Sequence, residues 1–150
     1  MLTALIFVVV VVLLLLVLVR YIRKAKWRQE IEAHAILPEE LHSLQDAHSK
    51  VLIFDVRQPL DFLADAEIIP GAARIAPREL ITNPSLIPAD TEAIIYCTCP
   101  GEETSKKILQ KALGMGYGRV KFLKGGIAAW KDKGYPVEPY SKPFHLDSAS

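Results

Sequence analysis

The chain carries little net charge and few of the residues that form metal sites or disulfides. Its 150 residues include 18 Lys and Arg against 17 Asp and Glu, a formal net charge of +1, so no overall field attracts it to nucleic acid. Its two cysteines, Cys97 and Cys99, are too close in sequence for an unstrained disulfide. They are also too few for a closed zinc site, and no histidine lies near them in sequence. The sequence also has no glycine-rich phosphate-binding pattern. We therefore expect no nucleic-acid partner, metal or cofactor.

Charge is also missing from the first part of the chain. Between Leu2 and Val19 the sequence has no charged residue, and Thr3 is its one polar residue. As a helix this run would span about 27 Å, close to the thickness of a bilayer core. A cleaved signal peptide would have a positive start, a shorter apolar core and a small-residue cleavage site, none of which is present. We predict a transmembrane helix over residues 1–20, because a lone segment in lipid must satisfy its own backbone hydrogen bonds.

The basic residues that follow this run predict its orientation. They are Arg20, Arg23, Lys24, Lys26 and Arg28, and nothing basic precedes the run except the amino terminus. The positive-inside rule then places the C-terminal side in the cytoplasm, with residues 21–36 as a basic juxtamembrane helix or linker. We expect a single-pass membrane protein whose domain lies in a reducing compartment, where both cysteines stay thiols.

The remainder alternates short apolar runs with helix-type segments. Strands are expected over residues 51–56, 73–76, 93–97 and 119–123, and helices near 38–44, 59–65, 77–80, 103–113 and 127–133. This alternation predicts an α/β domain with a largely parallel sheet. The polar residues 139–150 are expected to form a disordered tail.

Both cysteines lie between a buried strand and a helix. The apolar run that ends at Cys97 precedes them, and the helix-type segment from Glu103 follows. At such a position the first-turn N–H groups and the helix dipole favour a thiolate over a thiol. This arrangement suggests cysteine chemistry, carried by either Cys97 or Cys99.

Several stretches of the remainder match one pattern of motifs. They are Asp55-Val56-Arg57, Ile69-Pro70-Gly71-Ala72, a strand ending in cysteine, Leu123-Lys124-Gly125-Gly126-Ile127-Ala128-Ala129-Trp130 and Gly134-Tyr135-Pro136-Val137. Together they resemble the rhodanese domain, and the resemblance covers residues 37–138. It implies a five-stranded parallel sheet flanked by helices. It also implies a sulfurtransferase that takes sulfane sulfur from thiosulfate or a persulfide and passes it, as a cysteine persulfide, to a small or protein thiol.

The resemblance also suggests which cysteine carries the sulfur. In the family, five loop residues follow the active-site cysteine, and the next helix ends in a glycine-aromatic pair. Counting back from Gly116-Tyr117 places Cys99 at that position, with Cys97 as the alternative. The loop then consists of Pro100, Gly101, Glu102, Glu103 and Thr104, with Ser105 at the helix start. Gly101 permits the tight curvature that turns backbone N–H groups toward a central sulfur.

The sequence departs from the family pattern in charge. Active loops are often basic, whereas this one has Glu102 and Glu103 and no basic residue before Lys106; Ile68 also stands where the family often has histidine. If these carboxylates faced the sulfur they would repel a dianion such as thiosulfate, although we expect them to face solvent. A non-catalytic binding or redox-sensing module at the membrane is therefore the alternative hypothesis. A phosphatase would need an arginine about six residues past the cysteine, where this sequence has none.

Two residues outside the loop are candidate supporting residues. Asp55 and Arg57 follow the first long strand, at the sheet edge where open α/β sheets bind ligands. They either contact substrate or form a buried hydrogen-bonded network that fixes the loop after this strand. We favour the network, because buried polar groups in folded proteins are paired.

Overall fold

The computed structural model describes residues 1–98 and 102–142, except for the side chains of Leu2 and Leu5. The chain divides into two compact units, residues 1–33 and 34–150. The first unit is one helix, α1 (Leu2–Glu32), which continues through the basic segment without a break. Among the residues described, α1 is the helix that is long and apolar enough to cross a membrane.

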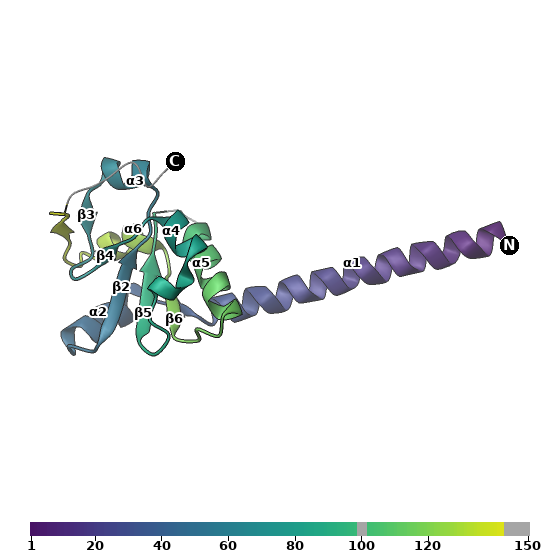
Figure 1. Cartoon of the computed structure of the whole chain (residues 1–150), viewed down its shortest axis with the longest axis horizontal. Coiled ribbons are helices and arrows are strands. Elements are labelled where there is room, and N and C mark those ends of the chain that lie inside the picture. Colours follow the sequence, from purple (N-terminus) through teal and green to yellow (C-terminus); the bar gives the residue numbers. More distant parts are fainter. Residues whose placement is uncertain (99–101, 143–150) are drawn as a thin grey trace. The chain divides into compact units, whose positions relative to one another are not determined.

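The second unit is built on a five-stranded sheet in the order β1-β6-β5-β2-β4, of which Figure 1 labels β6, β5, β2 and β4. The strands are β1 (Ala35–Ile36), β2 (Val51–Asp55), β4 (Ala73–Arg74), β5 (Glu92–Tyr96) and β6 (Val120–Leu123). Every neighbouring pair is parallel, with Ile53 opposite Ile94 and Ile95 opposite Phe122. The predicted α/β class and five-stranded parallel sheet are confirmed.

Helices cover both faces of this sheet. They are α2 (Pro38–Asp46), α3 (Pro59–Ala64), α4 (Pro77–Thr82), the 3₁₀ turn η1 (Pro84–Leu86), α5 (Glu103–Gly114) and α6 (Gly126–Asp132). Ile94 and Ile95 of β5 point to opposite faces, and both are fully buried. On one face Leu41 of α2 and Trp130 of α6 pack in the same cluster as Ile94. The continuous apolar run of β5 is therefore the pattern of a strand covered on both sides.

Three strands of two residues each were not predicted: β1, β3 (Glu67–Ile68) and β7 (Glu138–Pro139). β3 and β7 pair antiparallel, with Ile68 opposite Glu138. The backbone N–H of Tyr140 then donates to the Ala66 carbonyl, and the Tyr140 ring meets Phe62 edge-on at 5.0 Å. The disordered tail was expected to begin at residue 139, so ordered structure reaches the first residues of that segment. The rest of the segment, from residue 143, lies outside the described residues.

The boundaries next to the cysteines lie close to expectation. β5 ends at Tyr96 rather than Cys97. α5 begins at Glu103, as its helical pattern predicted, and not at Ser105, where the family resemblance placed the helix start. The residue before α5, Glu102, has a left-handed backbone with φ 50°. Glu103 then lies in the first turn, where the helix dipole stabilises a carboxylate.

Candidate functional site

The candidate site lies where β5 leads into α5, at the carboxyl edge of the parallel sheet. Cys97 and Thr98 follow β5 directly, and Glu102 precedes the first turn of α5. Cys99, Pro100 and Gly101 lie outside the described residues. The assignment of Cys99 as the reactive cysteine therefore stays a prediction, and the site is described from the residues on either side of it.

Cys97 is packed against the start of α6. Its side chain is buried, and its backbone carbonyl accepts a hydrogen bond of 3.3 Å from the N–H of Ile127. A Cβ on Gly126 would lie 2.0 Å from that carbonyl oxygen, so only glycine allows this approach. Burial at a strand end favours a packing role for this thiol, and the choice between Cys97 and Cys99 stays a prediction.

Glu102 is buried, and the expectation that it faces solvent is wrong. Its side chain reaches the turn before α6, where Oε1 accepts a hydrogen bond of 2.6 Å from the backbone N–H of Gly125. Oε2 lies 3.3 Å from the ammonium group of Lys106, one helical turn along α5. These two partners offset the cost of burying the carboxylate.

Glu103 is exposed as expected. The two acidic residues of the loop therefore differ, because the charge of Glu102 is compensated by Lys106. Lys106 is itself held over the ring of Phe122, with its ammonium group 5.2 Å from the ring centroid. The negative charge that a donor would meet at α5 is smaller than the sequence suggests.

Two hydroxyl groups flank the segment that contains Cys99. In the described part of the chain, Ser105 Oγ and Thr98 Oγ1 are buried and have no hydrogen-bond partner. Buried polar groups without a partner are rare in folded proteins, so both hydroxyl groups are candidate hydrogen-bond donors at this site. Ser105 was a candidate from its place in the loop, whereas no sequence pattern marked Thr98. Thr104 is half-buried in the first turn of α5.

Asp55 and Arg57 form a buried pair at the end of β2. Arg57 Nη2 lies 2.6 Å from Asp55 Oδ2, and its Nε donates to both carboxylate oxygens at 2.9 and 3.0 Å. The same guanidinium donates to the carbonyls of Asp65 and Glu67, each at 2.7 Å. Burial is the largest influence and disfavours its charge, but the hydrogen bond and charge of Asp55, together with the charges of Tyr96 and Asp65, outweigh burial and raise the pKa of Arg57. Arg57 thus ties the α3–β3 connection to the sheet.

Tyr96 extends this network from β5. Its hydroxyl lies 3.2 Å from Asp55 Oδ2 and accepts a hydrogen bond of 3.2 Å from the N–H of Ile69. Burial, followed by the charge of Asp55, raises the pKa of Tyr96, so the group stays a neutral phenol. Arg74 adds a cation 3.6 Å from Asp55 Oδ1. Because the side chains of Asp55 and Arg57 are almost fully enclosed, their contacts support the interpretation as a structural network.

Comparison with known proteins agrees with this architecture. The family model of the rhodanese-like domain matches residues 37–133. A protein named sulfurtransferase from Allochromatium vinosum is 33% identical over 87 residues, which cover 58% of this chain and 78% of that protein. The probable adenylyltransferase/sulfurtransferase MoeZ of Mycobacterium tuberculosis is 30% identical over 111 residues, which cover 72% of this chain and 27% of that protein.

Solved structures share the fold at lower identity. A full-length protein from Lactobacillus plantarum has a TM-score of 0.64 at 22% identity, covering 79% of this chain and 98% of that one. Thiosulfate sulfurtransferase from Pseudomonas aeruginosa has a TM-score of 0.60 at 24% identity, covering 82% of this chain and 25% of that one. The parallel sheet and the match of residues 37–133 to the family model lead to one conclusion: this chain belongs to the rhodanese-like domain family.

Proposed function

We propose that this protein is a membrane-anchored sulfurtransferase that carries sulfane sulfur as a persulfide on Cys99 and passes it to a thiol acceptor. The observation that carries the proposal is the position of Cys99 in the sequence. It lies between the buried end of β5 and the first turn of α5, within a rhodanese-like domain. Helix N-terminal N–H groups lower the pKa of a nearby thiol and stabilise its anion.

The reaction has two displacement steps. The Cys99 thiolate attacks the outer sulfur of thiosulfate, the S–S bond breaks, and sulfite leaves with the bonding electron pair. An acceptor thiolate then attacks the outer sulfur of the Cys99 persulfide, and the Cys99 thiolate is released as the leaving group. No external oxidant or reductant is needed, because the oxidation states are exchanged between donor and acceptor.

Neighbouring residues support this chemistry. The hydroxyl groups of Ser105 and Thr98 lack partners in the described part of the chain and flank Cys99 in sequence. We propose that they donate hydrogen bonds to the thiolate or persulfide sulfur. The pairing of Glu102 with Lys106 also removes part of the repulsion that an anionic donor would meet.

The membrane anchor is the second part of the proposal. Residues Ile6 to Val19 of α1 expose their apolar side chains, and five basic residues follow the run. We propose that α1 spans the bilayer and that the domain faces the cytoplasm. Carbonate extraction and protease protection of the full chain test this, and loss of residues 1–20 from the mature protein's mass would identify a signal sequence instead.

The test of catalysis compares two cysteine variants. Cys99→Ser should abolish sulfur transfer, whereas Cys97→Ser should retain most of it, because the Cys97 side chain is buried. Both variants should keep the far-UV circular dichroism of the wild-type protein. Full activity in Cys99→Ser would refute the assignment.

A non-catalytic binding or redox-sensing module is the second candidate. The exposed carboxylate of Glu103 and the lack of a basic loop residue before Lys106 favour it. Exposure of the wild-type protein to thiosulfate and to a glutathione persulfide separates the two candidates. A mass increase of one sulfur atom supports transfer, and no adduct with either donor supports the module.

A further inference from the structure

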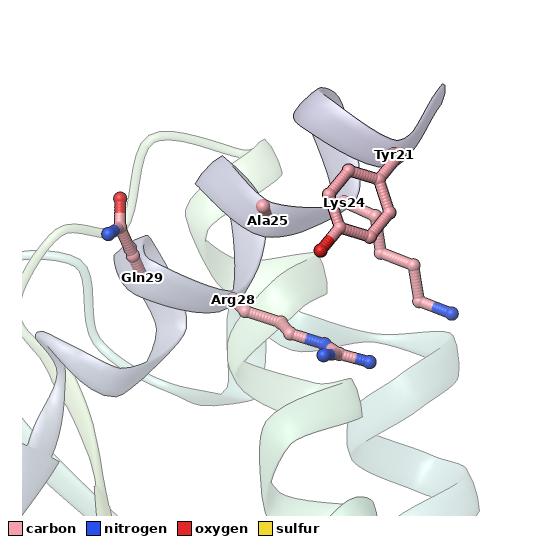
Figure 2. A pocket seen from close by; sticks show the side chains of 5 residues that line it. All are labelled: Tyr21, Lys24, Ala25, Arg28 and Gln29. Atoms are coloured by element: carbon pink, nitrogen blue, oxygen red, sulfur yellow. The ribbon is translucent and has the colours of Figure 1, made fainter. Parts of the chain in front are cut away.

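A hollow lies along one face of α1, directly after the apolar run. Tyr21, Lys24, Ala25, Arg28 and Gln29 line it, and its volume is about 380 Å³ (Figure 2). Tyr21, Lys24 and Arg28 follow one another at spacings of three and four residues, so they lie on one side of the helix.

The charges around this hollow favour an anion. Its lining contains two cationic side chains, Lys24 and Arg28, and no carboxylate. Figure 2 shows Tyr21, Lys24 and Arg28 extending to the same side of the helix, whereas Gln29 points away from them. Like charges four residues apart repel each other, so an anion bound between Lys24 and Arg28 would relieve this repulsion.

The spacing from the apolar run gives the depth of these groups in a bilayer. With a rise of 1.5 Å per residue, Tyr21 is about 3 Å, Lys24 about 8 Å and Arg28 about 14 Å beyond Val19. The headgroup layer on each side of the hydrocarbon core is about 5–8 Å thick. Helix side chains lean toward the N-terminus, which here is toward the membrane, and long basic side chains extend to the headgroups. All three polar groups can therefore reach the level of the lipid phosphates.

We propose that this face of α1 binds the phosphate of an anionic phospholipid, an inference that rests on the proposed membrane anchorage. A guanidinium matches two phosphate oxygens, an ammonium group adds a point charge, and a phenol donates one more hydrogen bond. Phosphatidylcholine carries its own cation, which would compete with Lys24 and Arg28. Phosphatidylglycerol has no such cation and is therefore the expected ligand class.

The chain offers a matched control for this site. Arg23 and Lys26 are exposed and lie on the opposite face of α1, because each residue turns the helix by about 100°. The variants Lys24→Gln/Arg28→Gln and Arg23→Gln/Lys26→Gln each remove one lysine and one arginine at similar depths. A general attraction of basic residues to anionic lipid would affect both equally.

Native mass spectrometry of the full chain in detergent, titrated with phosphatidylglycerol or phosphatidylcholine, measures the binding. We expect the wild type to prefer phosphatidylglycerol, Lys24→Gln/Arg28→Gln to weaken that binding about tenfold, and Arg23→Gln/Lys26→Gln to stay within about twofold of wild type. Equal losses in both variants, or equal binding of the two lipids by the wild type, would overturn the site. Displacement of the lipid by millimolar inorganic phosphate would overturn it in favour of a free-phosphate site.

A separate measurement distinguishes this proposal from the anchor on which it depends. The wild type and both variants should insert into phosphatidylcholine liposomes and resist carbonate extraction. If the wild type stays in the supernatant, both the anchor and the headgroup site are wrong. If it inserts but shows no difference between the two variants, only the headgroup site is wrong.

Discussion

Replacing Glu102 tests whether its carboxylate fixes the end of the cysteine loop. Glu102→Ala removes the acceptor of the 2.6 Å hydrogen bond from Gly125 and the partner of Lys106. A hydrogen bond to a charged group contributes about 1.5–3 kcal/mol, and a partly exposed ion pair adds at most about 1 kcal/mol. The free energy of unfolding should therefore fall by about 1.5–4 kcal/mol. Glu102→Gln keeps an oxygen acceptor and should lose about half as much.

Glu103→Ala is the matched control for this experiment. Glu103 is adjacent, acidic and exposed, so its loss should cost less than about 1 kcal/mol. Urea unfolding of the full chain in detergent, followed by near-UV circular dichroism, measures the difference. Transfer from thiosulfate should also fall in Glu102→Ala, because the loop loses its tie to the turn before α6. Equal stabilities of Glu102→Ala and Glu103→Ala would refute the proposed tie.

The remaining predictions concern backbone strain, the buried network and donor charge. Gly126→Ala should destabilise the protein by about 1–3 kcal/mol more than Gly116→Ala, as measured by chemical denaturation. Both glycines have a positive φ, but of the two only Gly126 lacks room for a Cβ. Asp55→Asn should lower the free energy of unfolding by about 3–5 kcal/mol, because Arg57 stays buried without its counter-ion. Glu103→Gln should raise kcat/KM for thiosulfate about two- to threefold at low ionic strength, and steady-state assays in 0.5 M salt should show the gain disappear.

The main elements of the fold could be predicted from local sequence patterns. The apolar runs of β2 and β5 have the length and composition of covered strands, and proline opens α2, α3 and α4. The two-residue strands β1, β3 and β7 could not be predicted, because a segment of that length has no measurable period. They form only where tertiary contacts bring their backbones together.

The environment of the candidate site was predictable only in part. The position of the cysteines between β5 and α5 follows from the order of the two elements in the sequence. The burial of Glu102 does not, because its hydrogen-bond partner Gly125 is 23 positions away. The sequence shows which residues are charged. Whether a charge is compensated depends on which hydrogen-bond donors and opposite charges the folded backbone brings near it.

The measurement that tests the central claim most directly is the location of the transferred sulfur. The full-length wild-type protein is exposed to thiosulfate, digested without reductant and analysed by tandem mass spectrometry. The account predicts one added sulfur on Cys99, none on buried Cys97, and loss of the added sulfur when a thiol acceptor is supplied. An added sulfur on Cys97 alone, or no adduct with any sulfane donor, would contradict it.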